Sequence, residues 1–420
     1  MQAAIKYREN LTDPSPTLAE LALKPIVAMA TLARMPEVEI PKLAAQLSSG
    51  LSDANIFMSQ CHLFTIVGPH DFAREMQSKA LERSSIYRIA GTQNPTIRLL
   101  ALMTPGDAME NTQLDYLIEG SDIQLDLLYI LPGQPLPTII PEHDIAIIAL
   151  CDSEKTRPLL ERIDKLIAQW PHPVLNLPNR ILRCYRDNLC QLLKPIPGLL
   201  IPPTVRANRV ELEKVARLTL PLSELLGDGT YPLTIRPLDF HSGKEFSKID
   251  TVKDLADYLN TTNAQEFFVS FYIDYCSADG LYRKARIALI DGLPYICHLA
   301  ISEHWIVHYK SASMAESISK RNEEASFMHH FDSDFALRHQ NALLAIAERL
   351  ELDYAVIDCA ETPDGSLLVF EIDNVGWVHA TDPVKIFPYK QAQMSKVFAA
   401  FRAMLIKTKE GTYPELDTST

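Results

Sequence analysis

The stretch Asp353-Tyr-Ala-Val-Ile-Asp358, continued by Thr362-Pro-Asp-Gly365 and Leu367-Leu-Val-Phe-Glu371-Ile-Asp373, decides the fold that this 420-residue sequence predicts. Two apolar runs are separated by a Pro-Asp-Gly segment, whose residue types favour a tight turn. Apolar runs on either side of such a turn predict a β-hairpin.

Three carboxylates fall on this predicted hairpin. Because side chains alternate between the two faces of a strand, Glu371 and Asp373 share one face, and Asp358 lies near the middle of a strand-like run. Converging carboxylates repel one another unless a cation neutralises them. Oxygen ligands suit Mg²⁺, which binds through a few carboxylates together with phosphate oxygens. The sequence therefore predicts a magnesium site here; the alternative, a solvated sheet face, is disfavoured by the apolar flanks.

A nucleotide phosphate needs donors at close range, and a segment upstream supplies them. In Tyr231-Pro-Leu-Thr-Ile-Arg236 an apolar strand delivers a cation, and Gly243 and Lys244 follow in a short loop. Glycine lets the backbone approach a phosphate closely. The pattern by itself occurs in many proteins. The GxxxxGK[ST] motif is absent from the whole sequence, which excludes the P-loop class.

The strand-like segment Glu266-Phe-Phe-Val-Ser-Phe-Tyr-Ile-Asp274 suits an adenine slot with a carboxylate at its rim for the ribose. An ordinary half-buried strand that ends on a solvated acid is the alternative. In the next segment, Tyr282-Arg-Lys-Ala-Arg286, alternation puts Lys284 and Arg286 on one face. Such a cluster of cations is more often a solvated face than a binding site. His298 and His308 follow as candidates for a general base.

Between Asn55 and Leu177, short apolar runs alternate with amphipathic stretches. Strands are expected at 64–67, 97–103, 123–130 and 145–150, and helices at 72–83, 112–117 and 155–168. This alternation favours a mainly parallel sheet. The turn after the first expected strand reads Val67-Gly-Pro-His-Asp71 rather than GxGxxG, which disfavours a dinucleotide site. Further helices are expected at 180–193 and, interrupted by proline, within the first 50 residues.

Composition excludes several classes of protein. A net charge of −13 argues against nucleic-acid binding, which needs a basic surface. The longest apolar runs carry His and Asp and are too short to span a membrane. Seven scattered cysteines support neither a zinc site nor a disulfide framework, and they fit a reducing compartment. We therefore expect a cytoplasmic protein with no nucleic-acid or membrane partner.

The order of these segments resembles the ATP-grasp superfamily, in particular its ribosomal-protein glutamate ligases and glutathione synthetases. Pro173-Val-Leu-Asn-Leu-Pro178 is similar to the family's VLN-P segment, and Gly198-Leu-Leu-Ile-Pro-Pro-Thr204 is similar to its GIPVPPT segment. The likeness covers roughly Val174 to Phe401. Each motif is degenerate, so the resemblance depends on their colinear order.

The resemblance implies how a nucleotide is bound. Arg236 matches the family's phosphate-binding lysine, and Gly243 and Lys244 match its glycine loop over the triphosphate. The hinge that holds adenine is matched by Ser270, Phe271 and Tyr272, with Asp274 near the ribose.

The resemblance also implies the reacting end of the site. Arg286 matches an arginine that faces the γ-phosphate and the acyl phosphate. Asp358, Glu371 and Asp373 match the D…E-x-N ligands of two Mg²⁺ ions.

Three positions depart from the family pattern. Asn188 stands where the family usually has a lysine in the helix after VLN-P. Arg236 replaces the strand lysine with a planar cation. Asp373 replaces the asparagine of E-x-N, which keeps an oxygen ligand and adds charge.

The implied fold combines α/β and α+β: N-terminal helices, a mainly parallel-sheet pre-ATP-grasp domain, and a two-subdomain ATP-grasp fold. We expect a helical extension at 1–54 and the pre-ATP-grasp α/β domain at 55–178. The N-subdomain, with a linker helix, is expected at 179–268 and the C-subdomain at 269–405, followed by a polar tail at 406–420.

The implied activity is a Mg·ATP-dependent ligase that joins a small-molecule or peptide carboxylate to an amine through an acyl phosphate. Two alternatives stay open. The same site phosphorylates a small molecule without ligation, or the chain is a catalytically degenerate ATP-binding or scaffold protein. The replaced lysines favour the degenerate binder, and the retained carboxylates disfavour it. No feature of the sequence settles whether the chain forms a homodimer.

Overall fold

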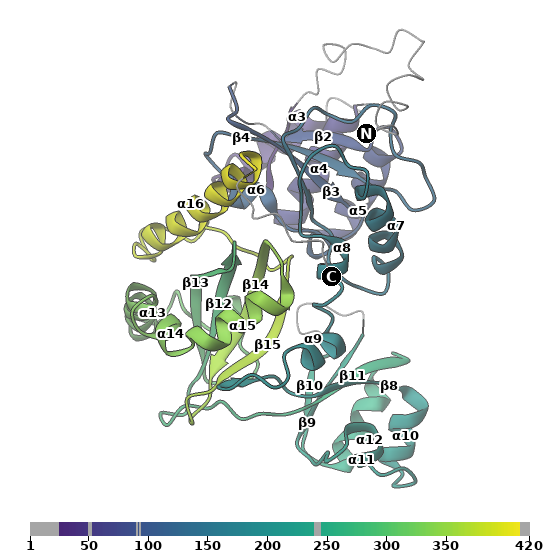
Figure 1. Ribbon diagram of the computed structural model, residues 1–420, viewed down its shortest axis with the longest axis vertical. Coiled ribbons are helices and arrows are strands. Elements are labelled where there is room, and N and C mark those ends of the chain that lie inside the picture. The colour runs from purple at the N-terminus through teal and green to yellow at the C-terminus, as the bar shows by residue number, and fades with distance from the viewer. Residues whose placement is uncertain (1–24, 49–52, 90, 92–93, 239–244, 412–420) are drawn as a thin grey trace.

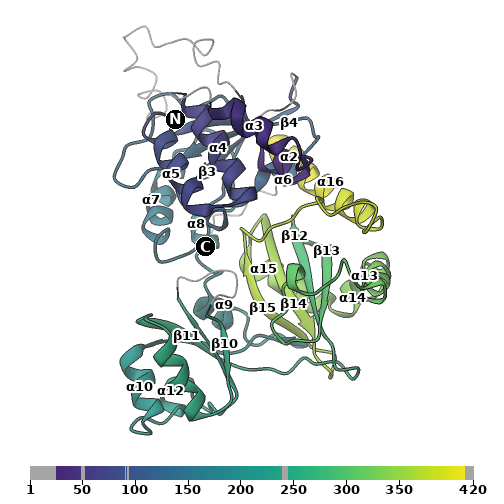
Figure 2. The same ribbon diagram turned by 180° about the vertical axis from the view of Figure 1, so that it is seen from behind.

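The computed structural model describes residues 25–48, 53–89, 91, 94–238 and 245–411, which form three β-sheets. Figures 1 and 2 show the N-terminal sheet at one end of the molecule and the other two sheets next to each other at the other end. The fold is mixed α/β, with parallel and antiparallel sheets.

The first sheet has six strands in the order β1-β2-β4-β3-β5-β6. Neighbouring strands are parallel except for β2, which is antiparallel to β4. The expected mainly parallel sheet is confirmed, and almost every residue of β3 and β5 is buried, as in a sheet covered on both faces. The strands are β1 (Pro25–Ile26), β2 (Ile86–Ile89), β3 (Ile97–Met103), β4 (Ile123–Tyr129), β5 (Ile145–Ile148) and β6 (Val174–Leu175).

The strand expected at 64–67 is wrong, because these residues form the end of helix α4 (Ala54–Val67). At the start of this helix the Asp53 carboxylate accepts a hydrogen bond from the Asn55 amide at 2.8 Å. α4 packs along α5 (His70–Leu81), and its middle residues are buried. A short apolar run does not distinguish a strand from a buried helix. Tertiary packing therefore decided this segment.

The remaining helices of the first half lie close to their expected places, with one exception. The expected helix at 180–193 is two short helices, α8 (Pro178–Ile181) and α9 (Arg186–Leu192), separated by the extended residue Tyr185. Helices expected before residue 25 lie outside the described residues. The others are α2 (Met29–Arg34), α3 (Ile40–Ser48), α6 (Leu114–Leu117) and α7 (Arg157–Ile167).

The second sheet is antiparallel, with four strands in the order β10-β9-β11-β8. Ile235 and Phe267 point into a core shared with the helices of one face, and both are fully buried. Because side chains alternate, Arg236, Phe268 and Ser270 point to the opposite face. The elements are β8 (Thr204–Asn208), β9 (Leu233–Pro237), β10 (Ser247–Ile249), β11 (Glu266–Phe271), α10 (Arg209–Ala216), α11 (Ser223–Leu226) and α12 (Val252–Thr261).

The third sheet has five strands in the order β13-β12-β14-β15-β7. β14 and β15 form the antiparallel hairpin that the opening stretch predicts, so that prediction is confirmed. The short strand β7 comes from the connecting segment and pairs in parallel with β15. The strands are β7 (Leu199–Leu200), β12 (Tyr282–Ile290), β13 (Leu293–Ser302), β14 (Tyr354–Glu361) and β15 (Leu367–Asp373).

Helices cover this sheet and join it to the first one. α13 (Ile318–His330), α14 (Phe335–Arg338) and α15 (Gln340–Leu350) belong to the third sheet, while α16 (Lys390–Lys409) contacts β12 and β13 and also β3 and β5 (Figure 1). α16 continues past the boundary expected at residue 405. Neither α16 nor any other helix in the described part of the chain is long and apolar enough to cross a membrane.

Candidate active site

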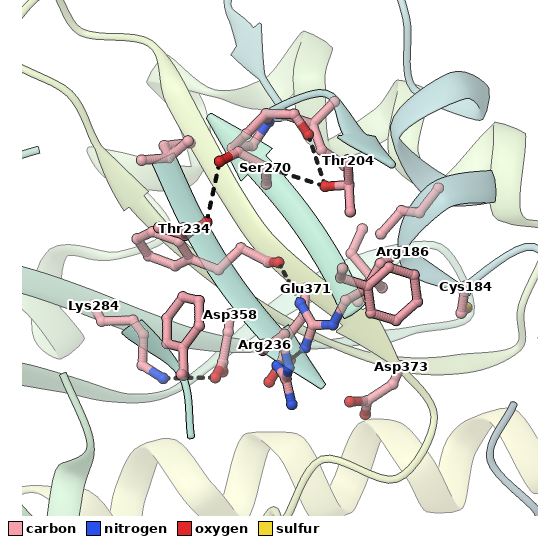
Figure 3. Close-up of a pocket in the computed structure, with 18 of the residues that line it drawn as sticks. Cys184, Arg186, Thr204, Thr234, Arg236, Ser270, Lys284, Asp358, Glu371 and Asp373 are labelled. Atoms are coloured by element: carbon pink, nitrogen blue, oxygen red, sulfur yellow. Dashed lines mark hydrogen bonds and ion pairs between the residues drawn. The ribbon is translucent and has the colours of Figure 1, made fainter. Parts of the chain in front are cut away.

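A cavity of about 420 Å³ lies between the second and third sheets (Figure 3). β9 and β11 supply one wall, and β12, β14 and β15 supply the other. Cys151, Asp152 and Ser153 reach it from the segment that follows β5 of the first sheet. The cavity brings together most of the predicted site residues: Arg236, Ser270, Phe271, Tyr272, Arg286, Asp358, Glu371 and Asp373.

One predicted nucleotide-binding residue of the described part of the chain does not line this cavity. Asp274 is exposed beside it, where its carboxylate accepts hydrogen bonds from the Cys276 amide at 3.0 Å and from the Tyr272 hydroxyl at 3.4 Å. Gly243 and Lys244 lie outside the described residues.

A row of cross-strand neighbours crosses the third sheet. His298 on β13 lies opposite Arg286 on β12, which lies opposite Asp358 on β14, which lies opposite Glu371 on β15. Directly opposite residues point to the same face of a sheet. The register shifts after Arg286 and again after Asp358. Such β-bulges re-aim side chains and are frequent next to active sites.

Two cationic side chains donate hydrogen bonds to Asp358. Lys284 Nζ donates to Oδ2 at 2.8 Å, and Arg286 donates from Nε to Oδ1 at 2.8 Å and from Nη2 to Oδ2 at 2.9 Å. Burial opposes ionisation of this carboxyl, but Arg286 and Lys284 outweigh it and hold the pKa of Asp358 well below its usual value. A solvated face, the more frequent arrangement for such a cluster of cations, is therefore wrong here, since both side chains turn onto a buried acid.

Glu371 pairs with Arg186, which enters the cavity from the start of α9. Burial opposes the charge on Glu371, but Arg186, Arg236 and Lys284 together outweigh it and lower the pKa of Glu371. Asp373 has no ion pair with a lysine or arginine of the described residues. Its Oδ1 accepts the backbone N–H groups of Val375 at 2.9 Å and Gly376 at 2.6 Å. Burial and the charge of Glu371 raise the pKa of Asp373 to about 7.

These contacts make Glu371 and Asp373 suitable for a magnesium ion. They share one face of β15, and Asp373 lacks the positive charge that its two neighbouring acids already have. In the described part of the chain, no three His, Cys, Asp or Glu side chains are grouped closely enough to hold a metal by themselves. Mg²⁺ commonly binds through one or two carboxylates plus substrate phosphates and water. The residues present therefore fit a metal that arrives with a nucleotide.

Arg236 faces this acidic edge from β9 of the second sheet. Burial and the nearby charge of Arg186 lower the pKa of Arg236 to about 9. The positive charges of the two guanidinium groups repel each other, and an anion placed between them would stabilise both charges. Arg186 and Arg236 therefore form a cationic end of the cavity that suits phosphate.

The predicted adenine hinge is fixed by hydrogen bonds to the start of β8. Ser270 Oγ donates to the Pro203 carbonyl at 3.0 Å, and Thr204 Oγ1 donates to Ser270 Oγ at 3.1 Å. Trp305, from the loop after β13, packs edge-on against Tyr272, with ring centroids 5.6 Å apart. Phe246, next to β10, lies 5.2 Å from the same indole ring. Aromatic rings from both sheets thus meet beside the cavity.

The sequence interpretation missed two of the cations in the cavity. It looked for a helix cation at position 188, but Asn188 is exposed and donates from its amide to the Leu182 carbonyl at 3.1 Å. Arg186, two residues earlier, enters the cavity instead. No local pattern marks Arg186, because the direction of its side chain depends on the interruption between helices α8 and α9 at Tyr185. Lys284 could have been found, since alternation already placed it beside Arg286.

Comparisons with known proteins concern the fold. The sequence matches no family model and no curated protein. Similar solved structures include a D-alanine–D-alanine ligase from Bacillus anthracis complexed with ATP, with 14% identity over 76% of this chain and 98% of that one and a TM-score of 0.44.

Two further similar structures carry the name of the superfamily that the sequence resembles. A RimK domain ATP-grasp protein from Sphaerobacter thermophilus is 14% identical over 73% of this chain and 99% of that one, with a TM-score of 0.41. The ATP-grasp ligase PsnB, complexed with precursor peptide PsnA2 and AMPPNP, is 14% identical over 75% of this chain and 100% of that one, with a TM-score of 0.40. The chemistry of the site is argued below from its own side chains.

Proposed function

We propose that this chain is a Mg·ATP-dependent ligase that joins a carboxylate to an amine through an acyl phosphate. The observation that carries the proposal is the charge distribution of the cavity. Arg186 and Arg236 form one cationic group, Lys284 and Arg286 form a second, and the acids Glu371 and Asp373 lie on the same sheet. A reaction between anions needs such a distribution, because phosphate and carboxylate repel each other until cations surround them.

The nucleotide has one orientation that matches this distribution. In that orientation the base would lie beside Ser270, Phe271 and Tyr272, and the phosphates would point toward Arg186 and Arg236, all of which line the cavity. Glu371 and Asp373 would hold the magnesium ion, which would supply positive charge to the phosphate oxygens. The adenine hinge would then contact the base of the nucleotide, and the acidic edge would lie near its phosphates.

The residues of the chain act mainly through charge and position. In the first step a carboxylate oxygen of the substrate attacks the γ-phosphorus, ADP leaves, and Arg236 and Arg286 stabilise the charge on the transferred group. In the second step the amine attacks the acyl carbon, phosphate leaves, and the amine loses a proton. Phe246 and Trp305 help to exclude water, which would otherwise hydrolyse the acyl phosphate.

One observation favours a second candidate, an ATP-binding protein without turnover. Asn188 is exposed and hydrogen-bonded within its own segment, so it contributes no cation where the family has a lysine. Arg186 supplies a cation to the same region but is paired with Glu371. This candidate predicts nucleotide binding without ADP formation for any carboxylate and amine.

Calorimetry with the non-hydrolysable analogue AMPPNP, with and without Mg²⁺, tests the nucleotide site. We expect Mg²⁺ to strengthen binding to the wild type and to have little effect on Glu371→Gln. Glu361→Gln is a matched control, because Glu361 lies on the same hairpin but pairs with Arg338 and His339 outside the cavity. Absence of binding to the wild type under both conditions would overturn the proposal. Screening carboxylate and amine pairs for ADP formation then separates the ligase from the inactive binder.

A further inference from the structure

Lys284 and Arg286, the two cations that hold Asp358, have more N–H donors than Asp358 accepts. Lys284 Nζ has three N–H donors and Arg286 has five. Lys284 gives one bond to Asp358, whereas Arg286 gives two to Asp358 and one, at 3.0 Å, to the Trp377 carbonyl. Both side chains line the cavity and are partly exposed to it, at 14% for Lys284 and 20% for Arg286. Their remaining donors are available to a ligand in the cavity.

Asp358 itself has little left to offer a metal. Its two oxygens already accept three charge-assisted hydrogen bonds, and the residue is 2% exposed. A divalent cation on either oxygen would lie close to the ammonium group of Lys284 and the guanidinium group of Arg286. Like charges at such distances repel strongly in a partly buried site. Binding a metal here would require at least one of the two cations to leave.

Asp373 differs from Asp358 on each of these points. One of its oxygens accepts two backbone N–H groups, and no lysine or arginine of the described residues pairs with it. Among the described residues, its neighbour Glu371 forms a salt bridge with Arg186. The acids on β15 therefore have less neighbouring positive charge than Asp358 on β14. A metal ion would supply the missing positive charge at β15.

We propose that Asp358 is a positioning residue that holds Lys284 and Arg286 as a pair of phosphate-binding cations, and that it does not bind the metal. This inference rests on the proposed function. It assigns Lys284 to the reacting end of the site and leaves the metal to Glu371 and Asp373. Arg286 and Asp358 lie between His298 and Glu371 in the cross-strand row. The free donors of Lys284 and Arg286 would therefore meet the transferred phosphoryl group beside the metal.

Counting bound Mn²⁺ by electron paramagnetic resonance at saturating AMPPNP tests the role of Asp358. We expect Asp358→Asn to hold as many Mn²⁺ ions as the wild type with the same affinity, and Glu371→Gln to lose Mn²⁺. Asp126→Asn is the matched control, because Asp126 on β4 is equally buried and also grips an arginine, Arg88. Loss of Mn²⁺ in Asp358→Asn, to the extent seen in Glu371→Gln, would overturn the inference.

Binding of AMPPNP in EDTA tests Lys284 without any metal and without altering Asp358. We expect Lys284→Met to weaken this binding about tenfold or more, and Lys284→Arg to restore most of it. Adenosine, which has no phosphate, should bind all three proteins equally. Lys396→Met is the control, since Lys396 pairs with Asp332 at 3.0 Å on the surface. An unchanged affinity in Lys284→Met would overturn the inference while leaving the nucleotide site standing. If the wild type bound no AMPPNP either in EDTA or with Mg²⁺, the proposed function would fall as well.

Discussion

The first and third sheets each contain a buried aspartate that accepts two hydrogen bonds from an arginine on the neighbouring antiparallel strand. Such a bidentate Arg–Asp pair is called a fork below. Arg88 lies opposite Asp126 on β2 and β4, just as Arg286 lies opposite Asp358 on β12 and β14. In both pairs Nε donates to Oδ1 and Nη2 to Oδ2, at 2.7 and 2.9 Å for Arg88 and at 2.8 and 2.9 Å for Arg286. The geometry of the fork therefore does not separate a structural ion pair from a functional one.

The surroundings of the two forks differ. The third donor to Asp126 is the neutral amide of Gln124, whereas the third donor to Asp358 is the ammonium group of Lys284. Asp358 also lines a cavity and lies at a β-bulge, while Asp126 lies in a ladder of continuous register. A structural ion pair gains nothing from a second buried cation, since each desolvated charge is costly. The surplus of positive charge is thus what indicates function in the third sheet.

The largest expected difference between the two forks is in catalysis. Arg286→Ala should lower the turnover number by about a hundredfold or more, because it removes a donor that stabilises charge in the transition state. Arg88→Ala should leave the turnover of folded protein unchanged. The measurement is steady-state ADP formation with the carboxylate and amine found by screening, normalised to folded protein. Equal losses in the two variants would show that Arg286 has only a structural role.

The features of the site that local sequence patterns carry were predictable. The Pro-Asp-Gly turn and its apolar flanks predicted the β14–β15 hairpin, and alternation correctly placed Glu371 and Asp373 on one face. Alternation also predicted that Lys284 and Arg286 point the same way, which their shared partner Asp358 confirms.

Features that depend on partners distant in sequence were not predictable. A strand pattern shows that Lys284 and Arg286 share a face, but it does not say which carboxylate they will meet. The entry of Arg186 into the cavity depends on where α8 ends and α9 begins, which no periodicity indicates. The residues at 64–67 are β-branched or aromatic and suggest a strand, yet packing against α5 keeps them helical.

The second difference between the forks is in stability and in its response to anions. Asp358→Ala should lower the free energy of unfolding by about 3–5 kcal/mol, because it leaves two cations that are largely, though not fully, buried without a counter-charge. Asp126→Ala should cost less, about 1–3 kcal/mol, since Arg88 is partly exposed and can reach water. Pyrophosphate should then stabilise Asp358→Ala more than Asp126→Ala, because an anion bound to the released cations stabilises the folded state. Urea unfolding with and without pyrophosphate measures both effects; equal responses would contradict the comparison.

A third prediction concerns the link between the two sheets that carry the forks. Asn176, after β6, donates from Nδ2 to the Tyr354 carbonyl at 2.9 Å and accepts from the Tyr354 amide at 3.0 Å. Its backbone has a positive φ of 53°, which asparagine tolerates better than most residues. Asn176→Gly removes the buried hydrogen bonds without backbone strain and should cost about 1–3 kcal/mol. Asn176→Ala adds the strain and should cost more. Thermal unfolding of both variants checks this order, and equal midpoints would show that the backbone is not strained.

The smallest effect is expected for a third fork, which lies in solvent. Arg402 on α16 donates from Nε to Oδ1 of Asp122 at 2.7 Å and from Nη2 to Oδ2 at 2.6 Å, and the two side chains are 39% and 33% exposed. The hydrogen bond from Arg402 is the main reason that the pKa of Asp122 lies below its usual value. The pair therefore stabilises the fold above the unfolded-state pKa of about 3.9, and this contribution is lost as the pH falls toward the lower folded-state pKa.

Because water and salt screen an exposed pair, Asp122→Asn should cost less than about 1 kcal/mol at neutral pH. The difference between the wild type and Asp122→Asn should stay constant from about pH 5 to pH 8 and shrink below about pH 4. Urea unfolding of both proteins across this range measures it. A cost as large as that of Asp358→Ala would mean that the geometry of a fork, rather than its burial and its surplus charge, sets its energetic weight.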